Sequence, residues 1–116
     1  MQTKQLTELV EEALADLKAK DMQVLDVRDA CNVTDVLVIA TGTSTRHVKA
    51  LANNIVVKAK ENNIMPYGTE GEQTGDWVLV DLGDVVAHVL TQEMRDFYQL
   101  ERLWSAPAAS GKTANG

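Results

Sequence analysis

The sequence is poor in cysteine and proline, and this scarcity excludes several classes of protein. Its 116 residues include one cysteine, Cys31, and two prolines. A single cysteine can form no internal disulfide and no cysteine-based metal cluster. No apolar run approaches the roughly 20 residues of a membrane-spanning helix. The acidic, amphipathic N-terminus over residues 1–17 lacks the basic and then apolar layout of a signal peptide. We therefore expect a cytoplasmic protein in a reducing compartment, without membrane contact.

Basic residues are also scarce, and charge is unevenly distributed along the chain. There are 11 Lys and Arg against 17 Asp and Glu, for a net charge of −6. Residues 1–30 carry seven acidic and four basic side chains, residues 31–75 four of each, and residues 76–104 six acidic against two basic. Nucleic-acid affinity comes largely from Lys and Arg that displace counterions. We therefore expect little direct nucleic-acid contact, and a basic protein partner for the C-terminal third.

Length and composition indicate one globular domain. The chain has 45% hydrophobic and 24% charged residues, which is typical of a folded, soluble protein. Its length is too short for two domains with separate cores. Residues 105–116, SAPAASGKTANG, are small, polar and aperiodic. We therefore predict a single domain over residues 1–104 and a disordered tail over residues 105–116.

Hydrophobic periodicity predicts eight elements in the order α-β-β-α-β-β-β-α. Helices are predicted over residues 3–20, 44–61 and 92–104. The first two have apolar stripes, made of Leu6, Leu9, Val10, Ala13, Leu14 and Leu17 and of Val48, Leu51, Ala52, Ile55 and Ala59. Strands are predicted over residues 23–27, 34–42 and 65–71, and as a hairpin over 76–82 and 84–90. The predicted fold class is α/β (α+β), with a mixed sheet of about five strands packed with helices.

The turn Gly42-Thr43-Ser44 lies between a predicted buried strand and a helix start. Backbone N–H groups at such a turn lie at the positive end of the helix dipole and suit an anion. A glycine for the turn and a serine cap are also what an ordinary strand-to-helix junction uses. Without a complete phosphate-loop pattern, the turn is only a weak indication of an anion-binding site.

Two aspartates, Asp81 and Asp84, flank the turn of the predicted hairpin. Paired carboxylates can hold Mg²⁺ or share acid and base roles, but aspartates beside a turn also simply cap it. No further Asp, Glu or His at metal-ligand spacing accompanies them. His88 alternates with Val86 and Leu90 on one sheet face, where a histidine is more often a core or interface residue than a general base. We therefore expect no catalytic residue, no metal and no cofactor.

Aromatic residues are few, and four of the five fall in the last third of the chain. They are Trp77, Phe97, Tyr98 and Trp104. We expect Phe97 and Trp104 in the core, whereas Trp, Tyr and Arg also dominate binding hot spots. Leu82 occupies the predicted hairpin tip, where we expect it to point outward. A recognition surface and a purely structural core role both remain open on this pattern.

Two long stretches carry a family resemblance. DVLVIATGTSTRHVKALANNI over residues 35–55 and GDWVLVDLGDVVAHVLTQEMRDFYQLERLW over residues 75–104 closely resemble the ribosomal silencing factor family, also called the iojap family. The resemblance covers roughly residues 3 to 104. Two long motifs in the right order are far more specific than any short signature.

The resemblance implies a nucleotidyltransferase-like fold and a non-catalytic function. Family members bind a uL14-type protein on the large ribosomal subunit and block joining of the small subunit, which represses translation in starvation or stationary phase. Organellar relatives are associated with large-subunit assembly, and some members form homodimers, so an assembly role and a homodimer remain open. Active nucleotidyltransferases carry Asp-x-Asp after the Gly-Ser turn, whereas Thr45-Arg46-His47 follows Ser44 here. The alternative function is a nucleotide-binding or nucleotidyl-transferring enzyme that uses the turn from Gly42 to Ser44.

The resemblance favours the C-terminal third as the partner-binding region. Within this region, hot-spot reasoning selects the individual residues. The predicted contact residues are Trp77, Asp81, Leu82, Asp84 and Tyr98, with Arg95 at the rim.

Overall fold

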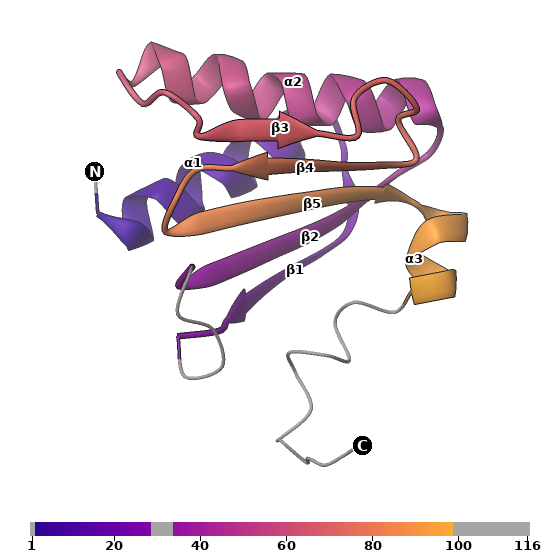
Figure 1. Cartoon of the computed structure of the whole chain (residues 1–116), viewed down its shortest axis with the longest axis horizontal. Coiled ribbons are helices and arrows are strands. Elements are labelled where there is room, and N and C mark those ends of the chain that lie inside the picture. The colour runs from indigo at the N-terminus through magenta and orange to yellow at the C-terminus, as the bar shows by residue number, and fades with distance from the viewer. Residues whose placement is uncertain (1, 29–33, 99–116) are drawn as a thin grey trace.

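A computed structural model describes residues 2–28 and 34–98, which form three helices and five strands (Figure 1). The elements are α1 (Thr3–Asp16), β1 (Lys20–Asp26), β2 (Val36–Gly42), α2 (Thr45–Glu61), β3 (Gly68–Glu70), β4 (Trp77–Asp81), β5 (Val85–Thr91) and α3 (Gln92–Tyr98). The predicted order of elements is confirmed over this part of the chain. Cys31, Trp104, the predicted helix end over 99–104 and the predicted tail over 105–116 lie outside the described residues.

The five strands form one mixed sheet in the order β1-β2-β5-β4-β3. Strands β2 and β5 pair in parallel, and the other neighbouring strands pair antiparallel. All seven residues of β2 are buried, because this strand lies inside the sheet. That burial agrees with the nearly continuous Val and Ile run from which the strand was predicted.

Helices α1 and α2 cover one face of the sheet with the predicted apolar stripes (Figure 1). The buried residues are Leu6, Leu9, Val10, Ala13 and Leu14 in α1 and Val48, Leu51, Ala52, Ile55 and Ala59 in α2. Helix α1 ends at Asp16 instead of the predicted residue 20, because Lys18 has a φ of 62° that an α-helix cannot continue. Leu17 is consequently 39% exposed rather than buried.

We call the opposite side of the sheet the open face. Its middle row crosses all five strands through Gln23, Ile39, His88, Leu79 and Glu70. The row nearer α3 contains Lys20, Thr41, Leu90 and Trp77, and the third row contains Leu25, Leu37, Val86, Asp81 and Gly68. Alternate residues of the same strands point into the main core, as the two-residue period of a strand requires. Among the described helices only α3 lies at this face, at one end of it (Figure 1).

Candidate functional site

The centre of the open face is organised by one contact between β4 and β5. The indole Nε1–H of Trp77 donates a hydrogen bond of 3.0 Å to Nδ1 of His88, and the two ring centroids are 6.0 Å apart. Because Nδ1 accepts this bond, the neutral His88 ring carries its proton on Nε2. Burial lowers the pKa of His88 from its usual 6.5, so the ring is neutral at pH 7. Trp77 and His88 are thus held as a fixed, uncharged pair.

A hollow of about 300 Å³ lies on the open face beside this pair. It is lined by Glu70, Gly71, Trp77, Leu79 and His88. Glu70, Leu79 and His88 meet there because the strand registers place them opposite one another in one row. Gly71 has a φ of +87°, and a Cβ on it would lie 2.0 Å from the carbonyl oxygen of Trp77. Only glycine fits this tight approach of the chain to β4.

Asp81 and Asp84 lie near Trp77 in the sequence but at the opposite end of β4, next to the loop before β5, which we call the loop end. Asp81 is four positions after Trp77 along an extended strand, a distance of about 13 Å. Asp81 accepts a 2.8 Å hydrogen bond from the N–H of Gly83, whose φ is +91°, so this carboxylate caps the turn. Asp84 lies at the loop end, with a carboxylate oxygen 3.5 Å from the hydroxyl of Thr3. Across residues 2–28 and 34–98, no three His, Cys, Asp or Glu side chains form a group that could hold a metal ion.

Leu82 and Arg95 do not lie on the surface, and the prediction of exposed positions for them was wrong. Leu82 is 6% exposed and belongs to the main core, because the loop folds back and the N–H of Leu82 donates to the carbonyl oxygen of Val85. Arg95 is 5% exposed. Its guanidinium donates to the hydroxyl of Thr41 at 2.8 Å and to the backbone oxygen of Asp21. Arg95 therefore anchors α3 to the sheet instead of forming a rim.

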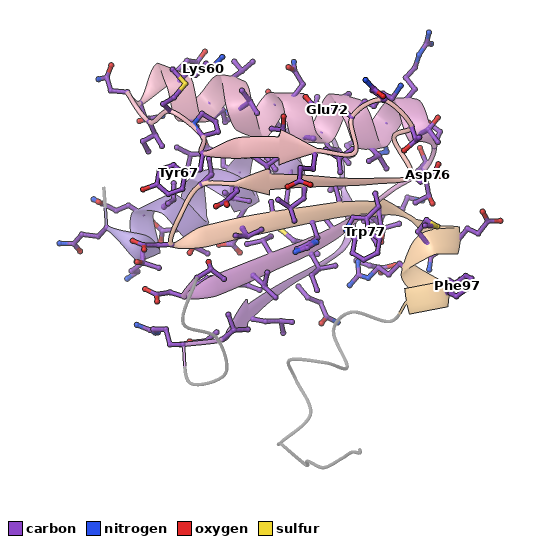
Figure 2. All side chains as sticks on the ribbon, viewed as in Figure 1. Lys60, Tyr67, Glu72, Asp76, Trp77 and Phe97 are labelled. Carbon is purple, nitrogen blue, oxygen red and sulfur yellow. The ribbon has the colours of Figure 1, made fainter. Side chains whose placement is uncertain are left out.

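The aromatic residues of α3 also differ from expectation. Phe97, which was expected in the core, is 75% exposed and projects from α3 (Figure 2). Tyr98 is the last residue of α3. Trp77 lies toward the α3 end of the sheet in the same view, whereas Tyr67 lies toward the opposite end (Figure 2). The predicted patch is therefore not one cluster: Trp77 belongs to the α3 end, and Asp81 and Asp84 to the loop end.

The Gly42-Thr43-Ser44 turn is closed by hydrogen bonds within the chain. The N–H of Thr43 donates to Nδ1 of His47 at 2.8 Å, and the hydroxyl of Ser44 accepts from the backbone N–H of His47 at 3.1 Å. The other ring nitrogen of His47, Nε2, lies 2.7 Å from the backbone oxygen of Leu17, to which it donates. These bonds cap α2 and connect its start to the end of α1.

Comparison with known proteins bears on what this domain is. A sequence model of the family described as "Ribosomal silencing factor during starvation" matches residues 1–115. The chain belongs to the ribosomal silencing factor family. It is 44% identical over 110 residues to ribosomal silencing factor RsfS of Chromobacterium violaceum, covering 95% of this chain and 90% of that protein. It is 41% identical over 100 residues to RsfS of Haemophilus influenzae, covering 86% of this chain and 98% of that protein.

A solved structure is similar to the silencing-factor domain described above. A crystal structure of a Chromobacterium violaceum protein superposes with a TM-score of 0.88 at 42% identity, covering 97% of this chain and 91% of that one. The family resemblance seen in the two long motifs is therefore confirmed, and so is the mixed α/β (α+β) fold.

Two properties of this silencing-factor chain bear on alternative functions. The family is named for silencing rather than for an enzymatic activity, and the Gly42 to Ser44 turn has a structural use as a helix cap. Across residues 2–28 and 34–98, no helix combines the length and the apolar character needed to cross a bilayer. The open face, with the Trp77–His88 pair and the hollow beside it, is a candidate for a binding surface.

The strand registers also reveal residues that sequence reasoning overlooked. Glu70 and Gly71 line the hollow beside Trp77, but the sequence analysis placed them only at the end of a predicted strand and gave them no role in a site. Pairing of β3 with β4 brings Glu70 opposite Leu79, and that register depends on a three-residue strand. The sequence did contain one indication of this site. His88 alternates with Val86 and Leu90, which places its side chain on one definite face of the sheet.

Proposed function

We propose that this chain is a ribosomal silencing factor that binds a uL14-type protein on the large ribosomal subunit. Bound there, it blocks joining of the small subunit and so represses translation in starvation or stationary phase. The observation that carries the proposal is the family match over residues 1–115. The open face supports it through β4, where Trp77, Leu79 and Asp81 are partly exposed, whereas Ile39 of β2 and Leu90 of β5 are buried.

The proposed contact surface centres on Trp77 and Leu79 and continues to Asp81. These three side chains alternate along β4 on the open face, and each is partly exposed. Asp84, in the loop before β5, and Tyr98, the last residue of α3, are further proposed contact residues. Leu82 supports it from the main core, and Arg95 anchors α3 to the sheet beside it.

The size of the open face indicates how far the contact extends. Five strands span about 19 Å, and three rows of side chains span about 13 Å along the strands. A stable specific interface buries about 800 Å² on each partner, which is more than these rows supply. The partner must therefore also contact α3, where Phe97 is 75% exposed, or the loop before β5.

Charge favours a basic partner. The ionisable residues in the three rows, apart from the neutral His88, are Glu70, Asp81 and Lys20, so two acidic residues stand against one basic residue. The whole chain carries a net charge of −6. Complementary charge accelerates association and suppresses binding to wrong partners, so a basic ribosomal protein suits this face better than bare RNA does.

Silencing by occlusion requires no chemistry. A factor that is present at about 100 times its Kd stabilises the bound subunit by roughly 2.7 kcal/mol. If the bound factor overlaps the path of the small subunit, joining is weakened by the same free energy, which is about a hundredfold. The hydrogen-bonded helix cap at Gly42 to Ser44 then needs no ligand to account for the function.

Sedimentation with purified ribosomal subunits tests the proposal. The full chain should co-sediment with large subunits and not with small subunits, and it should also bind the isolated uL14-type protein. Co-sedimentation with the large subunit without affinity for that protein would move the contact elsewhere on the subunit. Absence of binding to the large subunit would contradict the proposed function.

A further inference from the structure

The hollow beside Trp77 has a chemistry more specific than that of the open face as a whole. Of its five lining residues, Glu70 is the only one that is charged at pH 7, since burial keeps His88 neutral. Within residues 2–28 and 34–98, the Glu70 carboxylate makes no ion pair or hydrogen bond. A carboxylate that lines a recess and lacks a partner inside the chain is suited to a cation from outside.

The remaining walls suit a flat cation with an apolar stem. Trp77 and His88 contribute two rings in a fixed mutual orientation, and Leu79 contributes an aliphatic surface between Glu70 and His88. A guanidinium group stacks on aromatic rings and pairs with a carboxylate through a planar fork, whereas a lysine ammonium does neither as well. The methylene groups of the same side chain can pack on an apolar wall.

The dimensions suit one side chain. The volume of about 300 Å³ lies at the lower limit of small-molecule sites, which range from about 300 to 1,000 Å³. Gly71 forms one side of the hollow, where a Cβ would collide with the Trp77 carbonyl oxygen. An acidic side chain would be repelled by the Glu70 charge.

We infer that this hollow receives an arginine side chain of the partner protein, with its guanidinium between the Glu70 carboxylate and the Trp77–His88 pair. This inference rests on the proposed function, because it names the group through which the ribosomal partner engages the open face. It assigns to Glu70 a role in specificity. The arginine recognised there is a group that a basic ribosomal protein supplies.

Nuclear magnetic resonance of the full chain tests the chemistry without the ribosome. The probe is N-acetyl-arginine amide, and N-acetyl-norleucine amide is the apolar comparison of similar length. The arginine probe should cause saturable shifts of the Trp77 indole N–H and the Gly71 amide, and the norleucine probe should not. Substitution of Trp104 by Phe identifies the indole signal of Trp77. Absence of saturable shifts, or equal shifts with both probes, would overturn the inference.

The residue assignment is tested with a matched pair of variants. Glu70→Gln should weaken binding of the arginine probe by about tenfold or more, whereas Glu72→Gln should leave it unchanged. Glu72 is also exposed and only two residues away, but it lines a separate hollow of about 400 Å³ together with Lys49 and Lys60 of α2 and residues of β3 and β4. Equal effects of the two substitutions would overturn the role of Glu70.

Sedimentation separates this inference from the proposed function. If wild-type chain binds large subunits and Glu70→Gln binds about tenfold more weakly, both are supported. If Glu70→Gln sediments like wild type, the arginine inference is overturned and the proposed function stands. If wild-type chain does not sediment with large subunits at all, the proposed function is overturned. The assignment of the arginine to a ribosomal protein is then overturned as well.

Discussion

Trp77 and His88 are joined across the β4–β5 pair by a single hydrogen bond of 3.0 Å, in which the indole donates and the imidazole accepts. The two residues are diagonal neighbours, since Trp77 stands opposite Leu90 and His88 stands opposite Leu79. Cross-strand neighbours of this kind stabilise a sheet and fix the orientation of large side chains. The contact therefore presents the indole on the open face in a defined orientation, and the following predictions depend on it.

Trp77→Ala should abolish detectable co-sedimentation with large subunits while the domain remains folded. Truncation of a central hot-spot residue weakens binding by about 2 kcal/mol or more, which is roughly thirtyfold. The matched control is Val57→Ala, since Val57 is a 41% exposed apolar residue on α2, in the helical layer. Circular dichroism checks the fold of both variants. If Trp77→Ala and wild type sediment equally, the contact surface does not include Trp77.

Trp77→Phe separates the indole ring from its hydrogen bond. This variant keeps an aromatic ring but removes the Nε1–H donor, so the partly buried Nδ1 of His88 loses its partner. An unsatisfied group of this kind lowers the free energy of unfolding by about 1–3 kcal/mol. Urea denaturation of Trp77→Phe and of Tyr67→Leu, an aromatic position that is 80% exposed, should show a loss only in the first. Equal stability of Trp77→Phe and wild type would contradict a structural role for the bond.

The free energy of unfolding should fall as the solution is acidified below about pH 6.5. Burial lowers the folded-state pKa of His88 beneath its ordinary value of 6.5. Above pH 6.5 the ring is neutral in both states, so its contribution is constant. Below that pH the unfolded chain binds a proton that the folded chain resists, and stability is lost until the pH passes the folded-state pKa.

His88→Gln isolates this contribution in a stability profile between pH 4.5 and pH 7.5. As the pH falls, wild type should lose more stability than His88→Gln, because the variant lacks the His88 ring whose protonation favours the unfolded state. The ion pair of Asp26 with Arg28 does not interfere. The hydrogen bond from Arg28 lowers the pKa of Asp26 from 3.8 to about 2, so the stabilisation is lost only below pH 3.8. A pH-independent difference would show that His88 is not buried in solution.

Leu82→Ala should destabilise the domain rather than remove a surface contact. Leu82 is 6% exposed and packs in the main core, so truncation leaves a cavity and costs about 2–5 kcal/mol. The comparison is Met65→Ala, because Met65 is 70% exposed and should change stability by less than about 0.5 kcal/mol. Thermal unfolding measures both. Full retention of stability in Leu82→Ala would restore the interpretation of Leu82 as an exposed hairpin tip.

Arg95→Leu should loosen α3 from the sheet. The substitution removes donors to the Thr41 hydroxyl and to the backbone oxygen of Asp21, and a buried acceptor without a partner, as the Thr41 hydroxyl would be, costs about 1–3 kcal/mol. Arg46→Leu on the exposed side of α2 is the control. Hydrogen exchange should become faster in α3 for Arg95→Leu and remain unchanged for Arg46→Leu. Unchanged protection of α3 would contradict the anchoring role.

Periodicity alone predicted most of the fold. The apolar stripes of α1 and α2 and the buried run of β2 are strong, regular signals, because each depends on residues within one element. The mixed pairing and the order β1-β2-β5-β4-β3 depend on contacts between distant segments, and no local pattern specifies them. The end of α1 was missed because the chain turns at Lys18, a residue with a positive φ where glycine is the usual signal.

The candidate site was predicted less well, and the errors share one physical cause. A helical period states which residues lie on the same face, but not which face packs against the protein. In α3 the face with Arg95 packs inward and Phe97 is exposed, the reverse of what polarity suggests. Leu82 was expected to point outward because it occupies the predicted hairpin tip, but the loop folds it into the core. Glu70 could be recognised as a site residue only from the register between β3 and β4, which the sequence did not specify.

The most direct test of the central claim is the extent of subunit joining as a function of the concentration of this chain. Purified large and small subunits are mixed with increasing wild-type chain, and light scattering measures the fraction of joined ribosomes. Saturating inhibition by wild type, with Trp77→Ala requiring about thirtyfold more protein, is the predicted result. Undiminished joining at concentrations where wild type is bound to the large subunit would contradict silencing by occlusion.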